Sequence, residues 1–366
     1  MKYKWLIRIV YLIFIIFLLE LCGYFLLRFY SKSNDYISNR NYDKIREMLR
    51  GDLSVSKYWQ VANLNYIPNP NYKKGKLTHN SKGFRGIDVS VHRNGKYRIL
   101  CIGGSTTYGT GVKDDKHTYP AFLQEILEEK YGMQVEVINA GLEAATSFEE
   151  LSAYLFKYRY FKPDLVIIHS GGNDALAQAN FPNRQLDNTD YRKINFYVPS
   201  LSKGKYLLKS QFLSFLIIHF WYGDAYKDRD LFQYSPGKDS YFAKWSDEIT
   251  PTERILDTSY NSFYRNYLTL TNEILADSAQ VIHLCFLYNP EKSKHMYAQK
   301  YIDNIERNNK LIKSVAKKTD TRVLDLSGKI PYQYFIDDCH LNEQGERQKA
   351  EWIAPVIELM RNRITR

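Results

Sequence analysis

From residue 97 onward, hydrophobic and polar positions follow two alternating patterns. Short, nearly continuous apolar runs predict buried strands at residues 97–102, 135–138, 164–169, 280–287 and 322–326. Between them, apolar residues recur at helical spacing in residues 119–130, 148–160, 252–276 and 298–318. Strands that alternate with helices predict a mostly parallel sheet covered by helices on both faces. In such a sheet, ligands bind at the carboxyl ends of the strands.

The N-terminus has a different pattern, because residues 9–27 are apolar all round and contain one charged residue, Glu20. As a helix this stretch would span about 28 Å, close to the ~30 Å hydrocarbon thickness of a bilayer. We expect a single membrane-spanning anchor at residues 1–31. Basic residues lie on both sides of the apolar run, so charge bias alone does not decide its orientation; we expect the following domain outside the cytoplasm because the short basic tail before the anchor stays inside. The alternative is a cleaved signal peptide, which the length of the apolar run and the lack of a small-residue cleavage site disfavour.

Two polar segments complete the predicted organisation. Residues 32–96 are irregular and predict a linker, with a short helix followed by a strap over the next domain, which we place at residues 97–366. An insertion at about residues 178–250 separates the third and fourth strands. Within it, residues 212–222 are apolar but too short to cross a bilayer, so they predict a helix packed on the core. Contact with the membrane surface or with the substrate groove is the alternative for this helix.

The first predicted strand ends in the glycine-rich run Gly-Gly-Ser-Thr-Thr-Tyr-Gly, which contains Ser105. The run lacks the glycine spacing of a dinucleotide-binding loop and the lysine of a phosphate-binding loop. A serine between a strand and a helix can act as a nucleophile, and its own N–H can stabilise an oxyanion. A serine nucleophile needs a base, and His340 near the C-terminus is the candidate.

The residues around His340 suggest how its imidazole would be oriented. Asp337 lies three residues before it, a spacing at which a carboxylate can hold the imidazole Nδ1–H in a tight turn. Asp338 is the alternative partner, although its spacing of two residues is less favourable. Asn342 is a candidate N-cap for the helix that follows.

Two further loops could complete an oxyanion hole: Gly141 follows the second strand and Asn173 follows the third. The series Gly-Gly-Ser-Thr, Asn-Ala-Gly, Gly-Gly-Asn-Asp and Asp-Asp-Cys-His resembles the four blocks of the SGNH (GDSL) hydrolase superfamily over about residues 97–366. The first block, with Gly104 in place of the usual Asp, is similar to that of membrane-anchored bacterial members.

The resemblance implies an α/β fold, a flavodoxin-like three-layer sandwich with a mostly parallel five-stranded sheet, preceded here by the transmembrane helix. It also implies the roles of the site residues. Ser105 would be the nucleophile, Asp337 and His340 would complete the triad, and the oxyanion donors would be Ser105, Gly141 and Asn173.

Residues and resemblance together predict a membrane-anchored serine esterase that hydrolyses acyl esters, especially acetyl esters, with an envelope or exopolysaccharide glycan as the expected substrate. An O-acyltransferase with the same triad and a non-catalytic glycan-binding envelope protein are the alternatives. No cofactor or metal is expected, because the histidines form no zinc-hydrolase pattern and no CxxC pair occurs. Although the net charge is +11, the basic residues are scattered, so no nucleic-acid partner is expected.

Overall fold

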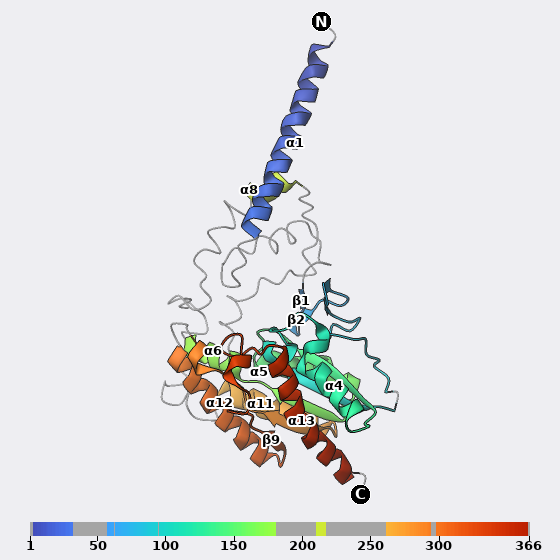
Figure 1. Cartoon of the computed structure of the whole chain (residues 1–366), viewed down its shortest axis with the longest axis vertical. Coiled ribbons are helices and arrows are strands. Elements are labelled where there is room, and N and C mark those ends of the chain that lie inside the picture. Colours follow the sequence, from blue (N-terminus) through green and yellow to red (C-terminus); the bar gives the residue numbers. More distant parts are fainter. Residues whose placement is uncertain are drawn as a thin grey trace. The chain divides into compact units, whose positions relative to one another are not determined.

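The computed structural model describes residues 3–31, 57–61, 63–93, 95–180, 210–216, 261–293 and 298–364 (Figure 1). The short helix expected early in residues 32–96 and most of the insertion lie outside these residues. The chain divides into two compact units, of which the first comprises Met1–Gln60 with Tyr197–Tyr234 and the second comprises Val61–Phe196 with Ser235–Arg366.

The first unit is built on α1 (Lys4–Ser31), whose stretch Lys4–Leu27 is long and apolar enough to cross a membrane. A short helix from the insertion, α8 (Gln211–Leu216), packs against it. The Glu20 carboxylate accepts a hydrogen bond from the backbone N–H of Gln211 at 2.6 Å and another from the Ser210 hydroxyl. The helix predicted within residues 212–222 therefore contacts α1 through its described part.

The second unit contains a five-stranded sheet in the order β6-β5-β7-β8-β9, in which every neighbouring pair is parallel. The strands are β5 (Tyr97–Gly103), β6 (Val135–Gly141), β7 (Leu165–His169), β8 (Gln280–Leu284) and β9 (Arg322–Leu324). This order is that of flavodoxin-like folds, in which the direction of winding reverses beside the first strand. All five strands were predicted from their apolar runs.

Helices cover both faces of the sheet, as predicted (Figure 1). The side chains of Leu100 and Ile102 pack with α5 (Ser147–Phe156), α11 (Ser262–Ala276) and α12 (Ala298–Lys318). The alternate residues Ile99 and Cys101 face α4 (Tyr119–Glu129) and α13 (Glu343–Ile364). Because both faces of the inner strands are buried, β5, β7 and β8 are mostly apolar rather than alternating with polar residues, whereas the edge strand β9 is largely exposed.

The short elements lie in the connections. Before the sheet come β1 (Tyr58–Val61), β2 (Asn65–Pro68), β3 (Lys73–Lys74) and β4 (Leu77–Thr78); α3 (Ser105–Tyr108) follows β5, and α6 (Gly172–Asn180) follows β7. Single 3-10 turns occur at Asp115–His117, Tyr158–Phe161, Pro290–Lys292 and Tyr332–Tyr334.

Residues 63–93, which we call the strap, contact the core formed by the sheet and its helices directly. The backbone N–H of Arg85 donates to the carbonyl of Asn139 in β6 at 3.3 Å. The Phe84 ring is buried against Tyr158 and Phe161, at centroid distances of 5.7 and 4.9 Å. The strap thus lies beside the end of β6, where site residues are expected.

Candidate active site

Ser105 is the first residue of α3 and directly follows the carboxyl end of β5. Its hydroxyl Oγ lies 2.8 Å from Nε2 of His340, 235 residues further along the chain. The backbone N–H of Ser105 points out of the first turn of α3 and has no hydrogen-bond partner among the described residues. The fold therefore brings together a hydroxyl, a base and a backbone N–H group that has no partner among the described residues.

The turn before α13 orients the imidazole of His340. Asp337 Oδ2 accepts the hydrogen bond from His340 Nδ1 at 2.7 Å, while Oδ1 accepts from the backbone N–H groups of Cys339 and His340 at 3.0 and 2.7 Å. The structure thus brings Asp337, and not Asp338, onto the imidazole Nδ1. Asn342 stabilises the start of α13, where its side-chain oxygen accepts the N–H of Gly345 at 3.0 Å.

The two charges of this turn shift each other's protonation. Burial disfavours the imidazolium, but the hydrogen bond and charge of Asp337 outweigh it, so the pKa of His340 is raised above its ordinary value. Partial burial of Asp337 opposes its ionisation, but the hydrogen bonds from His340 and Cys339 lower the pKa of the carboxyl below its ordinary value. Asp337 therefore stays ionised, and Nδ1 of His340 carries the proton, which leaves Nε2 to accept from Ser105.

Asn173 lies beside the nucleophile. Its amide nitrogen donates to the carbonyl of Ala145 at 2.8 Å, and a Cβ on Gly104 would lie 2.7 Å from the same nitrogen. Because an amide nitrogen carries two hydrogens, the second is left for a substrate oxygen. The close contact with Gly104 also gives a physical reason for glycine in place of aspartate directly before Ser105.

Gly141 is not placed as the sequence predicts. Its backbone N–H donates to the side-chain oxygen of Asn139 at 3.0 Å, so this donor is already used within β6. A Cβ on Gly141 would lie 2.1 Å from the backbone nitrogen of Tyr108 in α3. The glycine is therefore required for close packing of the strand against the nucleophile helix, and its N–H is already hydrogen-bonded.

The loop after β6 contains a residue that the sequence did not single out. Ala144 has φ 59°, a left-handed conformation that is unfavourable for a residue with a Cβ. It directly precedes Ala145, whose carbonyl holds the amide of Asn173. Backbone strain of this kind often occurs at functional positions. No glycine marks the position, so the sequence gave no signal for it.

Arg85 of the strap holds the other end of α3, and sequence reasoning missed it as well. Its guanidinium donates to the carbonyls of Tyr108, Gly109 and Val112 at 3.0, 2.6 and 3.0 Å, and pairs with Asp115 at 2.8 Å. The Arg85 side chain is fully buried. It satisfies carbonyls that a four-residue helix leaves without partners, so the strap fixes the nucleophile helix.

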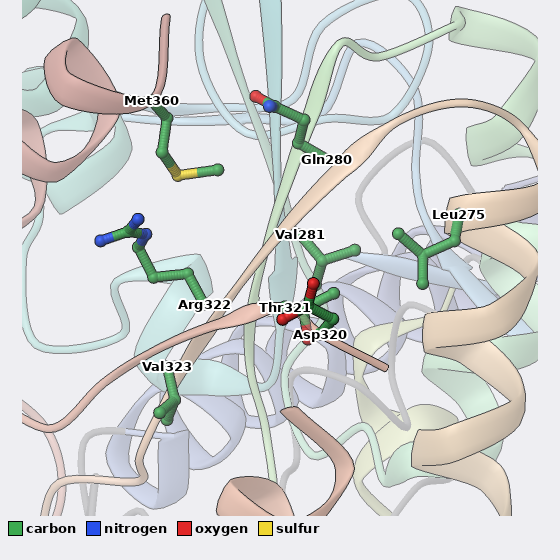
Figure 2. A pocket seen from close by; sticks show the side chains of 8 residues that line it. All are labelled: Leu275, Gln280, Val281, Asp320, Thr321, Arg322, Val323 and Met360. Carbon is green, nitrogen blue, oxygen red and sulfur yellow. The ribbon is translucent and has the colours of Figure 1, made fainter. Parts of the chain in front are cut away.

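Two other features, a possible metal-ligand cluster and a pocket, differ from this site in chemistry or in position. Among the described residues, Asp337, Cys339 and His340 are grouped closely enough to hold a metal ion, but two of them make the hydrogen bonds described above. Figure 2 shows a pocket formed by residues of α11, β8, β9 and α13, including Leu275, Gln280, Arg322 and Met360. Gln280 and Arg322 begin their strands, so this pocket lies at the amino edge of the sheet, opposite to Ser105.

A Ser-His-Asp arrangement at the carboxyl end of a flavodoxin-like parallel sheet is the one that serine hydrolases of the α/β class use. The chain belongs to the GDSL-like Lipase/Acylhydrolase family, whose model matches residues 101–348. The matched region contains Ser105, Asn173, Asp337 and His340. The protein is therefore an ester-bond hydrolase.

Solved structures with a similar fold include the acetyl xylan esterase AlAXEase, at 16% identity and a TM-score of 0.44 over 71% of this chain and 99% of that one. Axe2, an acetylxylan esterase from Geobacillus stearothermophilus, has 14% identity and a TM-score of 0.43 over 71% and 93%. A GDSL-like lipase from Bacteroides thetaiotaomicron has 15% identity and a TM-score of 0.42 over 74% and 93%. No curated protein matches the sequence of the chain.

Proposed function

We propose that the chain is a membrane-anchored serine esterase that removes acyl groups, especially acetyl groups, from glycans outside the cytoplasm. Ser105 is the nucleophile, His340 the general base and Asp337 the residue that orients the base. The observation that carries this proposal is the 2.8 Å contact between Ser105 Oγ and His340 Nε2, with Asp337 on the opposite ring nitrogen.

The reaction follows from the positions of the protons. His340 Nε2 accepts the Ser105 proton as Oγ forms a bond to the ester carbonyl carbon, and the resulting imidazolium is stabilised by Asp337. The imidazolium then gives this proton to the leaving alcohol oxygen as the ester C–O bond breaks. A water molecule attacks the acyl-Ser105 ester, and His340 accepts its proton and returns it to Oγ as the acid leaves.

Three donors are proposed for the oxyanion that forms at each tetrahedral stage. The backbone N–H of Ser105 and the amide of Asn173 adjoin the nucleophile. In place of Gly141, we assign the third donor to the backbone N–H of Ala144, because its left-handed backbone turns the loop immediately before the carbonyl that holds Asn173. Each donor lost should cost about 10²–10³ in turnover.

The membrane-anchored Gly-Gly-Ser-Thr type and the glycan substrate are proposed together. The length and apolarity of Lys4–Leu27 support an anchor, and the basic residues Lys2, Lys4 and Arg8 at its N-terminal end support a domain outside the cytoplasm. Acyl esters of surface polysaccharides are among the esters that such a domain would meet.

The test measures acetate release by the purified full chain in detergent from O-acetylated polysaccharides and from short-chain aryl esters, with Ser105→Ala as the control. We expect release by the native chain and none above background by the variant. Acetate release that does not depend on Ser105 would contradict the assignment. Adding a deacetylated glycan tests the acyltransferase alternative, in which acetyl groups would appear on the glycan rather than as free acetate.

A further inference from the structure

α13 places two ionisable side chains inside the protein core. Glu346 and Lys349 are 2% and 1% exposed. The rest of this buried face is apolar and contains Ala350, Ile353, Ala354 and Ile357. The Glu346 carboxylate accepts the backbone N–H of Tyr119, the first residue of α4, at 2.8 Å.

Lys349 has a partner for each of its three ammonium hydrogens. Its Nζ lies 3.3 Å from the carbonyl oxygen of Thr106 and 3.0 Å from Nδ1 of His169, and it sits 3.9 Å from the centre of the Tyr119 ring. Because an ammonium only donates, this contact makes Nδ1 of His169 an acceptor. The hydroxyl of Thr106 lies 3.2 Å from the same nitrogen.

These contacts join the two segments that carry the reacting groups. Thr106 directly follows Ser105 in α3, and His169 ends β7, four residues before Asn173. β5 and β7 are paired up to Gly103 and His169, and beyond that point their backbones separate. Lys349 connects the two segments at this point, behind the nucleophile, through its contacts with Thr106 and His169.

Stability of the fold does not explain a lysine at this position. Removing an ammonium ion from water costs several kcal/mol, and apolar residues of similar volume are often as stabilising as a buried ion pair or more so. The neighbouring buried positions of α13 are apolar, as this principle leads one to expect.

We propose that Lys349 is a positioning residue for ester hydrolysis, holding the peptide after Ser105 and the strand that leads to Asn173 in one arrangement through Thr106 and His169. This role rests on the proposed function and adds to it a residue that touches neither the substrate nor the reacting atoms. The ammonium form is the active form, because only that form donates to both partners at once.

The charge of Lys349 makes this role visible in the pH dependence of turnover. Burial lowers the pKa of Lys349 to about 8, against the opposing effects of Glu346 and Cys101. Of the other ionisable groups that face it, burial raises the pKa of Cys101 to about 12 and that of Tyr119 well above its ordinary value, whereas it lowers that of His169 well below. Glu346 is a carboxyl whose pKa is raised, chiefly by burial. As pH rises through the pKa of Lys349, the ammonium is lost and kcat should fall.

The chain contains a matched control for this test. Burial likewise lowers the pKa of Lys157 to about 8. Its Nζ lies over the ring of Phe84 at 4.7 Å, in contact with the strap rather than with α3 or β7. Lys157→Met therefore removes a lysine of similar pKa without disturbing the contacts of Thr106 and His169.

The experiment measures kcat and KM for a short-chain aryl ester between pH 6 and 10, together with thermal melts, for the native chain, Lys349→Met and Lys157→Met. The double variant Lys349→Met with Glu346→Gln removes both buried charges, in case Lys349→Met alone does not fold. We expect Lys349→Met to lower kcat about 10- to 100-fold, with KM within about twofold. Its melting temperature should fall, because Glu346 stays buried without its opposite charge, and should recover in the double variant, in which both charges are removed. The fall in kcat near pH 8 should disappear in this variant and persist in Lys157→Met.

Three outcomes would overturn the role of Lys349. They are a native kcat that stays level from pH 7 to 10, a folded Lys349→Met or double variant with native kcat, and a fall near pH 8 that disappears in Lys157→Met rather than in Lys349→Met. A native chain that hydrolyses no ester would overturn the proposed function, and the role of Lys349 with it. The two failures are therefore distinguishable.

Discussion

Replacing Asp337 with asparagine changes the site by one group and leaves its shape intact. The asparagine oxygen can still accept the N–H groups of Cys339 and His340, which Oδ1 accepts at 3.0 and 2.7 Å. The new amide would face Nδ1 of His340, where Oδ2 now accepts at 2.7 Å. Because an amide donates, Nδ1 would become the acceptor, and Nε2 would carry the proton. In that tautomer, His340 cannot accept the proton of Ser105.

Two effects of this substitution can be separated by magnitude and by pH. The wrong tautomer should reduce kcat by up to about 10⁴, equivalent to roughly 5.4 kcal/mol at 1.36 kcal/mol per tenfold change in rate. Loss of the carboxylate also removes the group that raises the pKa of His340. Because activity requires the neutral imidazole, activity falls as pH decreases through this pKa, and the fall should move to lower pH in Asp337→Asn.

The assay is the pH profile of kcat/KM from pH 4 to 8 for native chain, Asp337→Asn and Asp338→Asn. Asp338 acts on His340 only through its charge, so Asp338→Asn should change the rate by a small factor and shift the acidic limb slightly. A loss of less than tenfold in Asp337→Asn, or a greater loss in Asp338→Asn than in Asp337→Asn, would refute the assignment of Asp337 as the residue that orients His340.

Further predictions concern the supports of the site and the anchor. Arg85→Met should remove the guanidinium from three carbonyls and from the Asp115 carboxylate, and leave the Val112 carbonyl without its partner, lowering stability by about 3–5 kcal/mol in denaturant titrations; an unchanged midpoint would contradict this. Gly141→Ala should displace α3 and reduce kcat at least tenfold, since its Cβ would lie 2.1 Å from the nitrogen of Tyr108; native kcat would contradict that packing. Ala144→Gly should keep native kcat and gain up to about 1 kcal/mol of stability by removing the left-handed strain; a loss of stability would argue against strain there. A chain starting at Ser33 should be soluble, whereas the full chain should remain with membranes after carbonate extraction; release of the full chain would contradict an anchor.

The sheet was predictable because its inner strands are buried on both faces and therefore have a strong local signal. The ends of the helices were less predictable. The predicted helix at 148–160 ends at Phe156 and continues as a 3-10 turn, Tyr158–Phe161. The Tyr158 and Phe161 rings pack with Phe84 of the strap, a contact between segments that local periodicity does not contain.

In the candidate site too, some residues could be predicted from the sequence and others depend on contacts between distant segments. Ser105, Asn173 and His340 follow from residue type and position after predicted strands. The burial of Arg85 depends on carbonyls 23–27 residues away, so a lone arginine in a polar stretch gave no indication of it. The N–H of Gly141, predicted as an oxyanion donor, already donates to the Asn139 side chain, and the spacing of the two residues could have indicated this contact. An asparagine side chain commonly accepts the N–H two residues later, which would have indicated that this donor is already used.

The central claim is that Ser105 is a nucleophile activated by His340, and covalent labelling tests it most directly. The native chain, Ser105→Ala and His340→Ala would be treated with a fluorophosphonate probe, and the labelled peptide identified by mass spectrometry. We predict one adduct on Ser105 in the native chain, none in Ser105→Ala, and labelling slowed at least 100-fold in His340→Ala. An adduct on another residue, or equal labelling rates in the native chain and His340→Ala, would contradict the claim.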